Sequence, residues 1–98
     1  MSRIVWAQHA AADREAIFSY IEIESPAAAI SVDRRIKRSV YRLADFPESG
    51  RPGRVEGTRE SVVPKTPFII AYAVEAERIR VLRILHGARI WPDELKPD

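Results

Sequence analysis

Apolar residues recur at helical spacing through the first half of the chain. The segment from Ala10 to Glu24 has one apolar stripe, made of Ala16, Ile17, Tyr20 and Ile21. The charged residues of this segment fall away from that stripe, among them Asp13, Arg14 and Glu22. The pattern predicts an amphipathic helix over residues 10–24.

A second helix is predicted directly after the first. Ser25 is placed as an N-cap, and Pro26 takes the first helical position, where its missing N–H costs nothing. An apolar seam with spacings of three and four then follows, at Ala29, Val32, Ile36, Val40 and Leu43. A basic face lies opposite the seam and is interpreted as solvated, with Arg34, Arg35, Lys37, Arg38 and Arg42. Because almost no linker separates the two helices, we expect an antiparallel hairpin.

Strands are predicted at the start of the chain and through its second half. Residues 3–6 form a short opening strand, a loop covers 46–57, and a strand follows over 58–63. The strand over 68–75 directs Phe68, Ile70, Tyr72 and Val74 to one face, and Ile69, Ala71 and Ala73 to the other. The strand over 78–86 directs Ile79, Val81 and Leu85 one way, and Leu82 and Ile84 the other.

These elements define an α+β fold with the order β-α-α-β-β-β. A helical hairpin packs on one face of a small, mainly antiparallel sheet, and residues 1–98 form one domain. The strands over 68–75 and 78–86 are apolar on both faces. The face away from the helices must therefore be covered, or it presents an apolar patch to a partner. This pattern favours a protein that binds another protein.

The composition indicates the cellular compartment of the protein but does not decide its function. Cysteine is absent from the 98 residues, which excludes disulfides and thiolate metal sites and suits a reducing cytosol. The sequence lacks an apolar run of roughly 18 residues and a signal peptide, so we expect a cytoplasmic protein that is not bound to a membrane. The net charge is +2, with a basic excess at Arg78, Arg80, Arg83 and Arg89. This excess suits an acidic protein or a phosphate backbone and does not choose between them.

Two polar side chains end the last predicted strand. Arg83 interrupts the apolar row of Ile79, Val81 and Leu85. His86 ends the row of Leu82 and Ile84, just before Gly87. An unpaired Arg83 would be costly to bury, so we predict a carboxylate partner, either Glu60 or an acid of a binding protein. His86 is a candidate for acid–base chemistry or a structural imidazole at a strand end.

Several motifs together resemble the RelE/ParE toxin superfamily over nearly the whole chain. They include the Ala12-Asp13 pair, Phe46-Pro47, Gly57-Thr-Arg-Glu60 and Ile84-Leu-His-Gly-Ala-Arg89, followed by Trp91-Pro92. The resemblance implies the toxin of a bacterial type II toxin–antitoxin pair, a module used in plasmid stabilisation. It also implies that a ParD/RelB-like antitoxin wraps the toxin in a hetero-oligomer, and that no cofactor or metal is required.

Two mechanisms occur in this superfamily. RelE-like members cut mRNA in the ribosome with basic residues around the phosphate, whereas ParE-like members poison DNA gyrase. This chain matches the nuclease pattern poorly, because Ser61 and Ile69 stand where nucleases carry basic residues. The gyrase poison is therefore the favoured interpretation, and the alternatives are a ribosome-dependent mRNA endonuclease and a degenerate member that only binds antitoxin. Ser61 also replaces an apolar residue that is usual in relatives and could attenuate the toxin.

Candidate residues follow for each role, from the resemblance for the nuclease, from the apolar strands for the antitoxin, and from the basic and aromatic tail for the target. A nuclease would use Arg59, Arg83, His86 and Arg89. The predicted antitoxin contacts are Arg59, Phe68, Ile70, Tyr72, Arg80 and Arg83. The predicted contacts with the target are Arg89 and Trp91.

Overall fold

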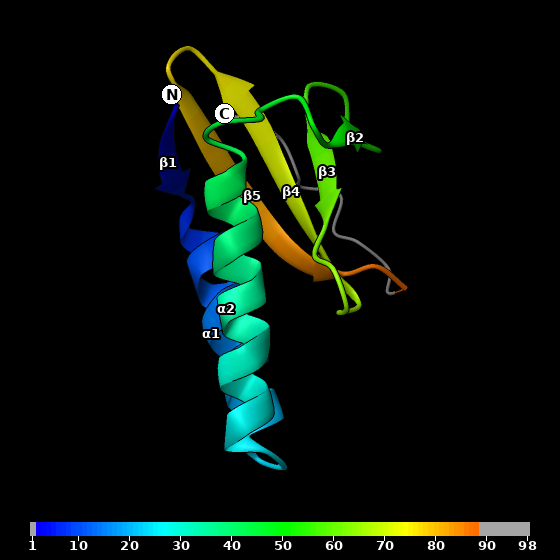
Figure 1. Cartoon of the computed structure of the whole chain (residues 1–98). Coiled ribbons are helices and arrows are strands. Elements are labelled where there is room, and N and C mark those ends of the chain that lie inside the picture. Colours follow the sequence, from blue (N-terminus) through cyan, green and yellow to red (C-terminus); the bar gives the residue numbers. More distant parts are fainter. Residues whose placement is uncertain (1, 89–98) are drawn as a thin grey trace.

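The computed structural model describes residues 2–88 and contains two helices and five strands (Figure 1). Their order is β1 (Arg3–Trp6), α1 (Gln8–Glu22), α2 (Pro26–Arg42), β2 (Arg51–Pro52), β3 (Arg59–Val62), β4 (Phe68–Glu75) and β5 (Arg78–His86). The strands form one sheet in the order β1-β5-β4-β3-β2. The β1–β5 pair is parallel and the other pairs are antiparallel. The predicted α+β class and the helical hairpin on a mainly antiparallel sheet are confirmed.

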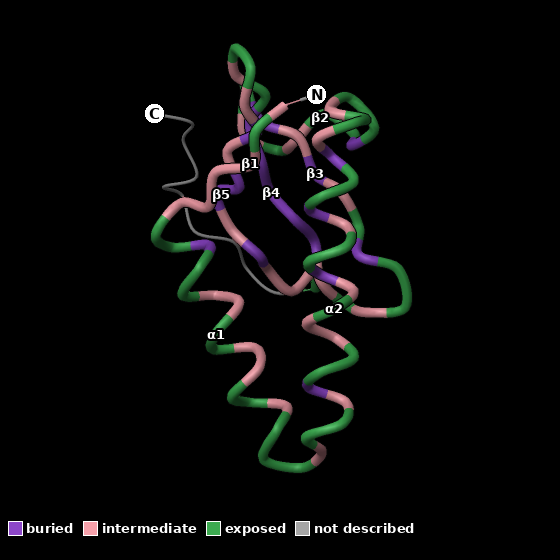
Figure 2. The backbone as a smooth tube through the Cα atoms, turned by 60° about the vertical axis from the view of Figure 1, so that its left-hand side comes forward, coloured by how far each residue is buried: buried purple, intermediate pink, exposed green. Residues whose placement is uncertain are grey.

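The hairpin forms where the local sequence rules place it. The Ser25 hydroxyl accepts a hydrogen bond from the Ala28 N–H at 3.1 Å, so it caps α2 as predicted. The helix α1 runs two residues earlier than expected at both ends. Figure 1 shows that the hairpin continues past the end of β5 and the β3–β4 turn, and Figure 2 shows that its tip is exposed.

Two apolar clusters lie on opposite faces of the sheet. The helix-facing cluster joins the hairpin to the two long strands β4 and β5, and consists of Ala10, Ile36, Val40, Leu43, Val63, Ile70, Tyr72, Ile79, Val81 and Ile84. The opposite cluster consists of Ile69, Ala71, Ala73 and Leu82, with Val55 and Leu85 packed against it. Its four central residues are at most 8% exposed, so the far face is covered rather than an open apolar patch.

The structure corrects the predicted faces of β5. Ile84 belongs to the helix-facing cluster with Ile79 and Val81, whereas Leu85 packs on the other side with Leu82. The cause is a change of register, because Ala71 lies opposite Arg83 while Tyr72 lies opposite Val81. Leu82 is therefore an extra residue in the strand, and such a β-bulge reverses the alternation that follows it.

A two-residue edge strand replaces part of the predicted 46–57 loop. β2 pairs with β3 through Arg51 opposite Glu60 and Pro52 opposite Arg59. The preceding loop is held by the buried Tyr72 hydroxyl, which donates to the Pro47 carbonyl at 2.8 Å and accepts from the Gly50 N–H at 3.0 Å. A Cβ at Gly50 would lie 2.6 Å from that hydroxyl, so the close approach requires glycine. Burial raises the pKa of Tyr72, which keeps the hydroxyl protonated as a donor.

Candidate partner-binding groove

An apolar groove of about 700 Å³ separates α1 from the end of β5 and the β3–β4 turn. Its walls are lined by side chains from both layers, including Ile17, Tyr20, Ile21, Phe68, Ile84 and Leu85. The apolar stripe predicted for α1 explains the groove, since the stripe is longer than the sheet on which the helix packs. Tyr20 is consequently 74% exposed although it belongs to that stripe. Apolar surface of this kind is typical of a site that another protein covers.

One wall of the groove contains an open strand edge. β1 ends where Trp6 lies opposite Val81, so the following residues of β5 have no β-strand beside them on that edge within the described chain. Beyond the end of β1, the Asp13 carboxylate of α1 accepts a hydrogen bond from the Ile84 N–H of β5 at 3.0 Å. The same carboxylate accepts two hydrogen bonds from the Arg83 guanidinium, at 2.7 and 2.9 Å. Asp13 therefore fixes the distance between α1 and β5 at the mouth of the groove.

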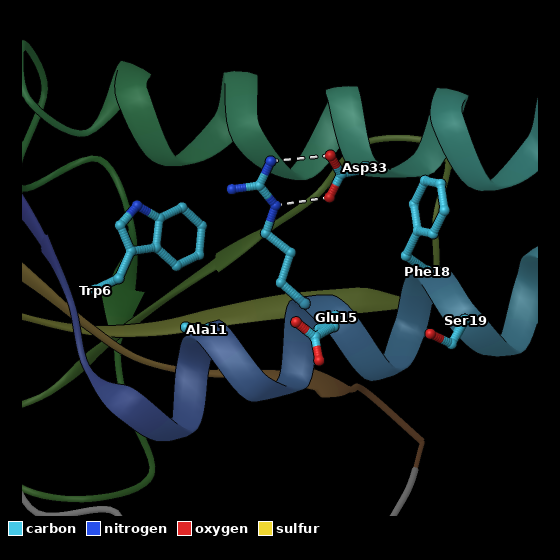
Figure 3. A pocket seen from close by; sticks show the side chains of 7 residues that line it. Trp6, Ala11, Glu15, Phe18, Ser19 and Asp33 are labelled. Atoms are coloured by element: carbon cyan, nitrogen blue, oxygen red, sulfur yellow. Dashed lines mark hydrogen bonds and ion pairs between the residues drawn. The ribbon is translucent and has the colours of Figure 1, made fainter.

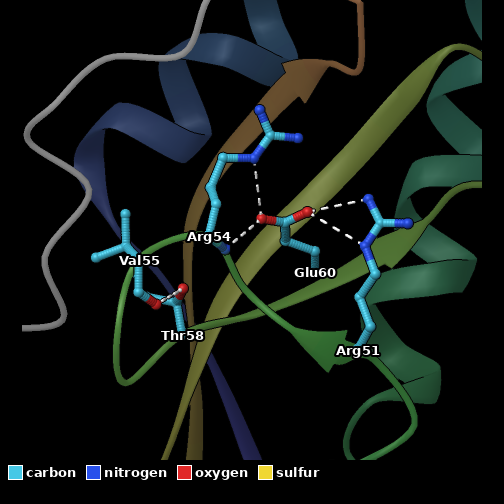
Figure 4. Close-up of polar contacts among 5 residues, drawn as sticks. All are labelled: Arg51, Arg54, Val55, Thr58 and Glu60. Carbon is cyan, nitrogen blue, oxygen red and sulfur yellow. Dashed lines mark hydrogen bonds and ion pairs between the residues drawn. The ribbon is translucent and has the colours of Figure 1, made fainter.

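This contact corrects the predicted partner of Arg83. A carboxylate partner is present, but it is Asp13 and not Glu60. Glu60 instead binds the exposed Arg51 and Arg54, with contacts of 3.0 and 3.2 Å (Figure 4). Helical periodicity places Asp13 away from the apolar stripe of α1, and no local pattern relates its side chain to Arg83, which lies 70 residues later.

The Glu60 cluster fixes the loop between β2 and β3. The Glu60 side chain is 3% exposed, and it also accepts the Arg54 N–H at 2.8 Å. Burial alone would raise the pKa of Glu60, but the Arg54 backbone N–H and the two guanidinium groups outweigh it and lower the pKa. Glu60 is therefore ionised at neutral pH and acts as a structural anion.

Of the candidate nuclease residues, Arg59 and Arg83 lie on strands that are not neighbours. Arg59 of β3 donates to the Gly50 and Glu48 carbonyls at 2.7 and 3.3 Å. Arg83 binds Asp13 at the far side of β5, and β4 separates β5 from β3. His86 packs edge-on against Phe68 with ring centroids 5.9 Å apart, and its Nδ1 accepts the Ala88 N–H at 3.2 Å. The fourth candidate, Arg89, lies outside the described residues, as does Trp91.

The residues predicted to contact antitoxin are divided between three environments. Ile70 and Tyr72 are 0% exposed in the helix-facing cluster, so they offer no surface to a partner in the isolated chain. Arg80 is bound to Glu75 at 3.1 Å on the other face of the sheet. Phe68 lines the groove, where Lys65 and His86 accompany it. Sequence reasoning missed Lys65, whose signal is its position after Pro64 in a turn between two strands.

A second hollow of about 560 Å³ lies between the two helices beside Trp6 (Figure 3). The Arg14 guanidinium lies 5.2 Å from the Trp6 ring centroid and binds both Asp33 oxygens, at 2.6 and 2.9 Å. The hydrogen bonds with Asp33 raise the pKa of Arg14, and the same bonds lower the pKa of Asp33. Since Arg14 and Asp33 bind each other across this hollow and Arg14 also contacts Trp6, we interpret it as a structural contact that joins β1 and α1 to α2.

Other kinds of site find no support in residues 2–88. No group of His, Asp and Glu side chains there could hold a metal ion. Neither of the described helices is long and apolar enough to cross a membrane.

The chain is a small α+β domain, and comparison with known proteins assigns it to the RelE/ParE superfamily of toxins. Residues 4–91 match the family described as ParE toxin of type II toxin-antitoxin system, parDE, and the chain belongs to that family. It is 40% identical over 93 residues to the predicted toxin Y4kP of Sinorhizobium fredii, covering 95% of this chain and 96% of that protein. It is 38% identical over 90 residues to Toxin RelE2 of Caulobacter vibrioides, covering 92% and 100%. A solved structure described as the chromosomal ParDE TA system from P. aeruginosa matches with a TM-score of 0.76 and 31% identity, covering 86% of this chain and 94% of that one.

Proposed function

We propose that this ParE-family toxin is neutralised by a ParD-type antitoxin that fills the groove between α1 and β5, and that its target is DNA gyrase. The observation that carries the antitoxin site is the groove itself, which combines an apolar wall on α1 with the open edge of β5. An extended or helical segment with apolar side chains would bury both. The similarity to a solved ParDE system supports a partner of the ParD type.

Lys65 supports the same site from backbone geometry. Its φ of 62° lies in the left-handed region, and the Thr66 N–H bonds the Val63 carbonyl across this turn. Glycine or asparagine suits such a position better, because a lysine there costs about 1 kcal/mol or more. Lysine places a cation at the lip of the groove, so we infer that the bound antitoxin segment carries a carboxylate near Lys65.

The structural contacts that hold the basic residues in place support gyrase, rather than mRNA, as the target. A ribonuclease needs an acid, a base and cations that converge on one phosphate. Arg59 is used to hold a loop and Arg83 is used to hold α1, while Ile69 is buried where nucleases carry a basic residue. A toxin that acts by binding has no such requirement.

Paired variants of two tyrosines test the groove. Tyr20→Ala removes a groove side chain, whereas Tyr41→Ala removes another exposed tyrosine, which lies on α2 and does not line the groove. Because buried aromatic anchors dominate interfaces, we expect Tyr20→Ala to weaken antitoxin binding by about 30-fold and Tyr41→Ala to leave it unchanged. Isothermal titration calorimetry with the cognate antitoxin measures both. Equal affinities for the two variants would remove the groove from the interface.

A second pair tests the Lys65 charge. Lys65 and Glu77 both have left-handed backbone conformations. Lys65 lies in the turn before β4, and Glu77 lies in the turn after it, at the opposite end of that strand. Changing either to glycine removes a side chain without backbone strain. We expect Lys65→Gly to weaken antitoxin binding several-fold, with a smaller salt dependence, and Glu77→Gly to leave the affinity unchanged.

The target is tested with purified components and in cells. We expect the toxin with gyrase and supercoiled plasmid to accumulate broken DNA, and induction in cells to produce no mRNA cuts at codon boundaries. Truncation after Gly87 is predicted to abolish toxicity, because it removes Arg89 and Trp91, whereas His86→Ala only weakens it. A folded His86→Ala protein that binds antitoxin and is wholly non-toxic would instead support the nuclease.

A further inference from the structure

The outward face of α2 carries a dense group of cations. Arg34, Lys37, Arg38 and Arg42 are exposed, and Arg35 is half-buried beside them. The helix has five cations and one carboxylate, so it alone carries +4 in a chain whose net charge is +2. In Figure 2 the exposed stretches follow α2 along its length. The remainder of the chain is net acidic, and the positive charge is concentrated here.

These cations have no carboxylate partners among residues 2–88. The single acid of α2, Asp33, is bound by Arg14 of α1, and the ion pairs of the described chain involve no α2 cation. Lys37 acts on Asp33 only at longer range, where it helps to lower the pKa of that carboxyl. A solvated helix face normally mixes both signs along its surface. This face has one sign and faces outward.

Aromatic rings support two of the cations. The Lys37 ammonium lies 6.0 Å from the Tyr41 ring centroid, and the Arg42 guanidinium lies 5.6 Å from that of Phe46. Such contacts restrain a long side chain without neutralising its charge. The cations are therefore partly ordered and still able to attract an anion.

The spacing of the cations fits double-stranded DNA. Arg34, Arg38 and Arg42 lie four residues apart on one stripe, which is about 12 Å long at 1.5 Å per residue. The major groove of B-DNA is also about 12 Å wide, so the two ends of the stripe can reach phosphates on both sides of it. The deep and narrow major groove of an RNA duplex does not offer this geometry.

A membrane surface fits less well. A helix that lies in a bilayer surface buries its apolar face among the lipids. The apolar face of α2 is already occupied, since Ala29, Ile36 and Val40 are fully buried against the rest of the protein. We propose that the outer face of α2 binds the phosphate backbone of double-stranded DNA, an activity independent of the proposed antitoxin groove.

The test is a titration of the full-length chain against a fluorescent 24-base-pair DNA of mixed sequence, followed by anisotropy between 50 and 200 mM salt. With three to five phosphate contacts, we expect micromolar affinity at 50 mM salt and a loss of about 40- to 500-fold at 200 mM. The variant Arg34→Gln/Arg38→Gln/Arg42→Gln should flatten the logarithmic salt slope by about 3 units. Circular dichroism confirms that the variants remain folded.

The matched control removes one charge from elsewhere. Arg38→Gln should flatten the salt slope by about 1 unit, and Arg3→Gln, at an exposed arginine outside α2, should leave it unchanged. Equal effects of the two single variants would overturn the proposal, since the attraction would then depend on net charge alone. Tighter binding to a 24-base-pair RNA duplex or to phosphatidylserine vesicles than to DNA would overturn it as well.

Discussion

Several arginines in and beside the sheet are bound to carboxylates, whereas the arginines of α2 bind none among residues 2–88. Within the described chain, Arg78 and Arg80 share Glu75, Arg51 and Arg54 share Glu60, and Arg83 binds Asp13. The arginines of α2 have no ion-pair partner in that part of the chain. Paired arginines fix loops and strand edges in place. Unpaired ones remain available to other molecules, so pairing distinguishes architecture from potential binding surface more clearly than residue type does.

The largest effect is expected where a paired arginine is half-buried. Asp13→Ala removes the carboxylate that binds the Arg83 guanidinium and accepts the Ile84 N–H. We expect a loss of about 3 kcal/mol in the free energy of unfolding. Urea denaturation followed by circular dichroism measures it. Glu75→Ala removes a more exposed carboxylate, which binds Arg78 and Arg80, and should cost clearly less, so equal losses would contradict this view of Asp13.

A smaller effect is expected at the Glu60 cluster. Glu60→Gln keeps the shape of the side chain but removes the charge that binds Arg51 and Arg54. We expect a loss of about 2 kcal/mol at pH 7, because both arginines can return to water. Thermal unfolding measures the change, and hydrogen exchange at Arg54 shows whether the loop opens first.

The same cluster predicts a pH dependence with a definite sign. The folded pKa of Glu60 is lowered from its ordinary value of 4.5, so the folded state binds fewer protons than the unfolded state near that pH. The advantage of wild type over Glu60→Gln should be constant from pH 8 to 6. It should then shrink as the pH falls below about 4.5 towards the folded pKa. A difference that grows on acidification would show that the sign is wrong.

The smallest effect is expected on α2. Replacing Arg34, Arg38 and Arg42 by glutamine removes three charges with no ion pair to break. We expect the free energy of unfolding to change by less than about 0.5 kcal/mol. A large loss of stability would mean that these residues serve the fold, which would remove the contrast with the sheet.

The fold was predictable wherever a local rule decides the structure. The Ser25 cap and the two faces of β4 follow from a hydrogen-bonding rule and from strict alternation, and both are confirmed. The faces at the end of β5 were not predictable, because the bulge at Leu82 is a property of strand pairing and leaves no mark in the strand's own sequence. β2 was missed for a similar reason, since two residues are too short to show a period.

The candidate site was predictable only in part. The apolar stripe of α1 could be recognised, but the groove depends on how far that helix runs past the sheet, which is a tertiary property. The pairing of Asp13 with Arg83 joins segments whose only sequence signal is an arginine in an apolar row. The arginine in an apolar row correctly predicted that Arg83 binds a carboxylate, but it did not identify Asp13 as that carboxylate.

The position of β5 has a consequence for how the protein folds during its synthesis. It is the strand that both β1 and β4 require as a neighbour, yet it is the last of the described strands to be synthesised, and its pairing with β1 closes a loop of about 75 residues. Sheets that depend on such distant contacts form late and slowly. During translation the hairpin and β1 emerge with their apolar faces uncovered, and the groove does not yet exist because one of its walls is β5. The molecule therefore acquires its core and its binding site in a single late step, which delays any toxic activity until β5 has been synthesised.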